Sequence, residues 1–115
     1  MLPKRYRLTR SRDFARVRRF GRSAGSSLLA VYVLPRQSVD LRIGFSASKR
    51  VGKATVRNRV KRLMREAVRP QLPSVRTGQD LVFVARPAAA RASYHQIAET
   101  VAYLLRKSGA RCRDA

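Results

Sequence analysis

The chain has 115 residues and carries 27 Lys and Arg against 6 Asp and Glu, for a formal net charge of +21 at pH 7. With 44% hydrophobic residues, the chain has enough apolar side chains that disorder from a shortage of them is excluded. It contains no run of about 18 apolar residues that would support a membrane-spanning helix. The expected partner is nucleic acid, because a polyanion relieves the self-repulsion of this charge and neutralised phosphates release counterions.

The first predicted helix follows a basic N-terminal segment. Residues 1–10 are predicted to form an extended tail, because they are basic and contain a proline. A short helix is predicted over residues 12–20, with Ser11 as its N-cap and Gly21 as its stop.

Two strands are predicted after this helix. Residues 23–27 are small and predict a loop. Residues 28–34 form a near-continuous apolar run, and residues 41–47 alternate apolar with polar or small side chains, which is the period of a strand. We expect these two strands to pair as an antiparallel hairpin.

A helix, a strand and a second helix are predicted in the remainder. After a basic connector, a helix runs over about 55–69 and ends at Pro70. Residues 80–86 form an apolar strand in which Phe83 is expected in the core, as is Phe45 earlier in the chain.

The last predicted helix begins with a capping box and ends near a glycine. Ser93 and Gln96 have the spacing of that motif, and the helix runs to about residue 107, with Gly109 as its stop. We find no repeat or linker, so residues 1–115 are expected to form a single domain, with a second basic tail at about 108–115.

The helix predicted at 55–69 separates apolar from cationic side chains. At 100° per residue, one stripe contains Val56, Val60, Leu63, Met64 and Ala67. Residues 49–65 hold eight cations and no acid, whereas an ordinary solvated helix mixes charges of both signs. The candidate RNA-binding residues of this segment are Lys49, Arg50, Lys53, Arg57, Asn58, Arg59, Lys61, Arg62 and Arg65.

Residues 43–66, IGFSASKRVGKATVRNRVKRLMRE, resemble the signature of the bacterial ribonuclease P protein subunit. That signature consists of a strand, a K-x-x-G-type connector and R-N-R-x-K-R-x-x-R-E on a helix. The similarity extends to Asp13-Phe14, to Tyr32 and to residues 80–86, and covers about residues 6–107. It implies an α+β fold, an α/β sandwich of αβββαβα order with a left-handed βαβ crossover, whose fourth strand we expect near residues 46–51.

The resemblance also implies a function. The family's protein joins one catalytic RNA, and the complex removes the 5′ leader from precursor tRNA; the RNA carries the chemistry with bound Mg²⁺, and no protein-bound cofactor is expected. The basic helix and its connector face the catalytic RNA, while a cleft beside the first helix takes the single-stranded leader. By position, the cleft residues are Phe14, Arg18, Tyr32, Ser46, Ser48, Lys49 and Arg86.

Some positions depart from the family pattern or have a second explanation. Arg18 stands where a second cleft aromatic is common, with Phe20 two residues further on, and Pro87 stands where a lysine is frequent. Core packing is the competing explanation for Phe14 and Tyr32.

No catalytic or metal-binding residues are predicted within the protein itself. Its six acids are scattered, and His95 stands alone in the first turn of the last helix as a solvent-facing or capping residue. The single cysteine, Cys112, and the lack of an apolar signal segment predict a reduced, cytoplasmic setting. Neither a membrane nor a protein partner is expected. The alternatives are a non-catalytic RNA-binding or ribosomal-type assembly protein and a sequence-specific DNA binder.

Overall fold

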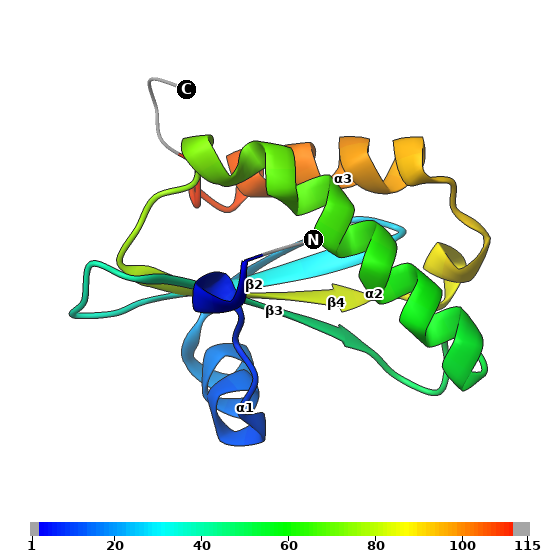
Figure 1. Cartoon of the computed structure of the whole chain (residues 1–115), viewed down its shortest axis with the longest axis horizontal. Helices are drawn as coiled ribbons and strands as arrows, with labels where there is room; N and C mark the ends of the chain where they lie inside the picture. The colour runs from blue at the N-terminus through cyan, green and yellow to red at the C-terminus, as the bar shows by residue number, and fades with distance from the viewer. Residues whose placement is uncertain (1–2, 112–115) are drawn as a thin grey trace.

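A four-stranded sheet forms the middle of the structure, and helices cover both of its faces (Figure 1). The structure is a computed structural model that describes residues 3–111. Its strands are β1 (Arg22–Gly25), β2 (Leu29–Pro35), β3 (Leu41–Ala47) and β4 (Gln79–Ala85). Its helices are α1 (Ser11–Phe20), α2 (Ala54–Val68) and α3 (Tyr94–Lys107), with 3₁₀ turns η1 (Lys4–Tyr6), η2 (Arg69–Ser74) and η3 (Pro87–Arg91). The predicted α+β class and αβββαβα order are confirmed.

The strand order is β1-β2-β4-β3, so the predicted hairpin of β2 with β3 is wrong. β4 lies between them, antiparallel to β2 and parallel to β3, and α2 connects the parallel pair. Burial explains this order, because β4 is buried almost throughout and suits the centre of a sheet, whereas β3 leaves Arg42 and Ser46 partly exposed and suits an edge. The left-handed crossover stays a prediction from the resemblance.

The fourth strand is β1, which lies before β2 and not in the predicted segment 46–51. Its serine, alanine and glycine have little intrinsic preference for a strand, so the sequence favours a loop there. Pairing with β2 overrides that preference: Ser23 lies opposite Tyr32, and Ala24 lies opposite Val31 and joins the core. After Ala47 the chain leaves the sheet in a turn.

The sheet divides the interior into two cores. Alternate residues of β2 and β4 point to opposite faces, so Val31 and Phe83 pack under α2 and α3, while Tyr32 and Val82 pack under α1. The core under α1 is small and centres on Leu8, Val17 and Val82. Within residues 3–111, the structure contains no helix that is both long enough and apolar enough to cross a membrane.

The helix ends agree with the predictions in part. The capping box is present: the Gln96 backbone N–H donates to the Ser93 hydroxyl, and Gly109 follows α3 at a φ of 76°. Ser11 is not an N-cap, because Arg10 occupies that position without a side-chain cap. α2 ends at Val68, and the chain continues as η2, whose first turn accommodates Pro70.

Both predicted tails are shorter than expected. In the N-terminal segment, η1 forms a turn and the Leu8 amide donates to the Ile43 carbonyl, which adds the chain to the edge of β3. In the C-terminal segment, the buried Gln79 amide donates to the Ala110 carbonyl at 3.1 Å. Cys112, on which the redox prediction rests, lies outside the described residues.

Candidate RNA interface

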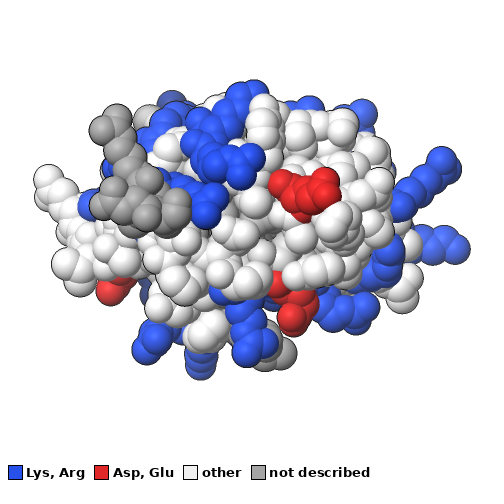
Figure 2. Space-filling view, turned by 90° about the horizontal axis from the view of Figure 1, so that it is seen from above, with Lys and Arg blue, Asp and Glu red and all other residues white. Residues whose placement is uncertain are grey.

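α2 packs on the sheet with one side and presents cations on the other. Val60, Met64 and Ala67 are buried and Val56 and Leu63 half-buried, which confirms the predicted apolar stripe. Of the predicted RNA-binding residues, the exposed ones are Lys49, Arg50, Lys53, Asn58, Arg59 and Arg62, and the half-buried ones are Arg57, Lys61 and Arg65. Figure 2 views the side formed by α2 and α3, where basic side chains project around much of the rim and acidic ones are isolated.

Two of these arginines also have contacts within the protein. Arg59 donates from Nη1 to the Ala90 carbonyl at 3.1 Å and from Nη2 to the Ala92 carbonyl at 3.3 Å. The Arg65 guanidinium lies 5.9 Å from the centre of the Phe45 ring. Arg59 therefore ties α2 to the end of η3, a structural role that the basic motif did not reveal.

The predicted leader cleft lies on the opposite face of the sheet, along one flank of α1. The Phe14 ring covers Gly44 so closely that a Cβ at Gly44 would collide with it. The Arg18 guanidinium lies 5.6 Å from the centre of the Tyr32 ring. Ser46 pairs with Val84 and lies on the same face. Phe14, Arg18, Tyr32 and Ser46 are thus brought to one side of the sheet.

The remaining cleft residues lie where β3 and β4 end. Because Ala47 and Ala85 are partners in the parallel pair, the residues that follow them, Ser48 and Arg86, leave the sheet at the same edge. Arg86 reaches β1: a Cβ at Gly25 would lie 2.7 Å from its Nη2. Lys49 follows Ser48 and is exposed in the turn between β3 and α2.

The other aromatic residues are placed differently. Phe83 is fully buried, as predicted, and stacks on the half-buried Phe45 with 5.9 Å between ring centres. Phe20 is 65% exposed near the end of α1. On the helical wheel it lies about 120° from Phe14, on the other side of the buried Val17, so the two rings do not lie side by side.

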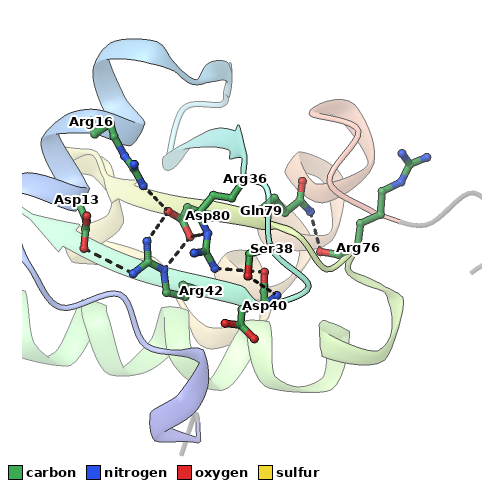
Figure 3. A network of polar contacts seen from close by, with 9 residues as sticks. All are labelled: Asp13, Arg16, Arg36, Ser38, Asp40, Arg42, Arg76, Gln79 and Asp80. Carbon is green, nitrogen blue, oxygen red and sulfur yellow. Dashed lines mark hydrogen bonds and ion pairs between the residues drawn. The ribbon is translucent and has the colours of Figure 1, made fainter.

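A buried carboxylate, Asp80, joins three arginines (Figure 3). Arg42 donates to it twice, from Nε at 3.0 Å and from Nη2 at 2.8 Å. The Nε of Arg36 lies 2.8 Å from one Asp80 oxygen, and Nη2 of Arg16 lies 3.3 Å from the other. The hydrogen bonds that Arg42 donates to Asp80 raise the pKa of Arg42 above its ordinary value. The sequence analysis did not predict this cluster. Arg42 and Arg16 lie 38 and 64 residues from Asp80 along the chain.

The titratable groups do not gather into a metal site in the described part of the chain. No group of three or more His, Cys, Asp and Glu residues there is placed to hold a metal ion. His95 is exposed, as predicted, and its Nε2 lies 2.6 Å from a Glu99 oxygen. Asp13 lies 3.6 Å from an Arg42 nitrogen.

A sheet covered by helices on both faces, with a cationic helix on one face and the pair of Arg18 and Tyr32 on the other, defines a strongly basic protein of the α+β class. A family model described as Ribonuclease P matches residues 2–109, and the chain belongs to this family. The ribonuclease P protein component of Alkaliphilus metalliredigens is 40% identical over 101 residues, which cover 88% of this chain and 91% of that relative.

Solved structures agree with this membership. The ribonuclease P protein of Staphylococcus aureus matches with a TM-score of 0.84 at 28% identity, over 93% of this chain and 98% of that one. The protein of Thermotoga maritima matches with a TM-score of 0.79, also at 28% identity, over 88% of this chain and 96% of that one.

Proposed function

We propose that this chain is the protein subunit of ribonuclease P, the ribonucleoprotein endonuclease that matures the 5′ end of tRNA. The observation that carries the proposal is α2, whose family signature forms a basic surface without an acid between Lys49 and Arg65. Val60 and Met64 anchor the other side of the helix in the core. The helix therefore docks on its own protein while it presents guanidinium groups to RNA phosphates.

The catalytic RNA is the proposed partner of α2 and its connector, and the 5′ leader of precursor tRNA is the proposed ligand of the cleft. Phe14 and Tyr32 offer aromatic faces, and Arg18 and Arg86 offer positive charge beside them. Stacking on aromatic rings tolerates any base, so this combination suits a single strand of variable sequence. Because α1 and α2 lie on opposite faces of the sheet, one protein binds both RNAs at once.

We assign the cleavage itself to the RNA subunit and its Mg²⁺. Asp13 and Asp80 are engaged by arginines, and His95 is paired with Glu99 on an exposed helix, which supports a protein that binds and positions RNA. A cytoplasmic location is proposed with this activity.

Reconstitution tests the proposal. The protein is added to the cognate ribonuclease P RNA at low magnesium, and cleavage of precursor tRNA is followed with a leader-bearing substrate, with mature tRNA as the product-binding control. We expect the protein to raise the rate of leader removal, because its cations replace part of the counterion requirement of RNA assembly.

Two outcomes would count against the proposal. Tight RNA binding with no gain in cleavage over the RNA alone would favour a non-catalytic assembly protein. A preference for duplex DNA over the ribonuclease P RNA in a competition experiment would favour a DNA-binding protein instead.

A further inference from the structure

A second groove lies on the flank of α1 that faces away from the predicted leader cleft. Its volume is about 560 Å³, and it lies between the start of α1, the end of β2 and the start of β3. Four of its lining residues are arginines, namely Arg10, Arg16, Arg36 and Arg42. None of the four belongs to the basic motif on α2 or to the predicted cleft.

More guanidinium groups gather here than one carboxylate neutralises. Arg42 alone places one hydrogen bond on each oxygen of buried Asp80. Arg36 and Arg16 nevertheless approach the same carboxylate, and Arg10 adds a fourth guanidinium to the groove. Like charges held this close repel one another, so the cluster has an excess of positive charge that a bound anion would relieve.

Donors remain available to such an anion. A guanidinium has five N–H groups, and Asp80 takes only part of those of Arg16, Arg36 and Arg42. The Asp40 carbonyl accepts from Nη2 of Arg36 at 3.4 Å, and Asp13 lies 3.6 Å from Nη1 of Arg42, which still leaves N–H groups on each arginine. The side chains of Arg16, Arg36 and Arg42 are 47%, 19% and 28% exposed, so they are held from below by Asp80 and reach solvent in the groove. Three carboxylates oppose binding: Asp13 lines the groove, Asp80 lies beneath it, and Asp40 is close enough to attract Arg42.

We propose that this arginine groove, defined by Arg10, Arg16, Arg36 and Arg42, binds a phosphodiester of RNA as a third contact beside α2 and the cleft. The inference rests on the proposed ribonucleoprotein function and adds a site to it. Figure 3 shows three of the guanidinium groups converging on Asp80 from α1, from the β2–β3 turn and from β3, a preorganised arrangement that suits bidentate phosphate contacts.

The sharpest test compares Arg10→Gln with Arg12→Gln. Both residues are exposed arginines at the start of α1, but only Arg10 lines the groove. Each variant removes one charge, so a general loss of attraction affects both equally. Arg10→Gln is expected to weaken RNA binding about tenfold more than Arg12→Gln. It is also expected to reduce the salt slope, which is the slope of the logarithm of the binding constant against the logarithm of the salt concentration, by about one unit.

Two arms identify the source of the phosphate. In the first, the binding of each variant to the ribonuclease P RNA alone is measured across a salt series. In the second, the affinity of each reconstituted holoenzyme for precursor tRNA is measured with a long leader, a short leader and no leader. A selective loss in the first arm assigns the groove to the RNA subunit, and a loss only with the long leader assigns it to the substrate.

Equal behaviour of Arg10→Gln and Arg12→Gln in both arms would overturn the groove as an RNA site, and Arg16→Gln provides a second variant of the same groove. If the unchanged protein binds neither RNA, the ribonucleoprotein function fails as a whole, which separates the two failures. Circular dichroism before each assay confirms that the variants are folded.

Discussion

Asp80 is a single carboxylate that holds together three segments far apart in the chain. It is fully buried on the α1 side of β4 and receives Arg16 from α1, Arg36 from the β2–β3 turn and Arg42 from β3. A charge buried in this way is tolerated only while it is paired and hydrogen-bonded. These ion pairs therefore hold α1 against the sheet, and so they position the residues on both sides of that helix.

Replacing Asp80 with asparagine is expected to lower the free energy of unfolding by about 3 kcal/mol. The change removes the charge that opposes three guanidinium groups, and the cost lies at the lower end for a broken buried pair because the arginines reach solvent. Urea unfolding followed by circular dichroism measures it. Asp40→Asn, in the exposed β2–β3 turn, is the matched control, with an expected change within about 0.5 kcal/mol; equal effects of the two variants would contradict the role of Asp80.

Phe14→Ala is expected to weaken the holoenzyme's affinity for leader-bearing precursor tRNA by about 1–3 kcal/mol, the value of one stacked base. Affinity for mature tRNA is expected to stay unchanged, because that substrate lacks the leader. Tyr103→Ala removes an exposed aromatic from α3 as a control. Equal losses for precursor and mature tRNA would show that Phe14, which also packs on Gly44, acts on the fold alone.

The helix α2, which we propose as the main RNA surface, has an apolar side and a cationic side within one helical period. Its apolar stripe contributes to the larger core, and its cations line the opposite side. Arg59 shows that the division is incomplete, because it belongs to the R-N-R motif and yet donates to two carbonyls near η3. Charge on a helical wheel therefore predicts a binding side, and only the contacts show which cations also support the fold.

Arg62→Ala and Arg59→Ala are expected to separate binding from stability. Arg62 is exposed on α2, so its loss should lower the salt slope of RNA binding by about one unit and change stability by less than about 0.5 kcal/mol. Arg59→Ala should also lower the free energy of unfolding, by about 1–2 kcal/mol, because it removes donors from two carbonyls. Arg106→Ala, exposed on α3, controls for the loss of one charge; a salt slope unchanged in Arg62→Ala would argue against a phosphate contact there.

At the scale of the whole molecule, the charge of +21 opposes the compact state. The longest extent is 37 Å, and the Debye length is about 30 Å at 0.01 M salt but about 8 Å at 0.15 M. Charges on all sides of the protein therefore repel one another in dilute salt and are largely screened at physiological ionic strength.

The urea midpoint of the protein without RNA is accordingly expected to rise as NaCl is increased from 0.01 to about 0.15 M. Screening also weakens the ion pairs of Asp80, but cations outnumber acids 27 to 6, so relief of repulsion should prevail. Denaturation in urea, which is uncharged, leaves the ionic strength under control. A midpoint that falls with added salt would show that the Asp80 cluster outweighs the general repulsion.

The sequence by itself determined the family, the bounds of α2 to within a residue, the α2 stripe of apolar side chains and the capping box of α3. Each of these depends on residues close together in the chain, where the helical period and local hydrogen bonding act directly. The burial of Phe83 follows in the same way from the apolar run around it.

Only the tertiary structure decided the rest: the place of β4 between β2 and β3, the strand character of β1, and the placing of the two predicted RNA surfaces on opposite faces of the sheet. It also brought Arg16, Arg36 and Arg42 to Asp80. Strand pairing and the pairing of buried charges depend on contacts between residues far apart in the chain. Burial of the whole sheet decides which partners meet, and this leaves no periodic signal in the sequence.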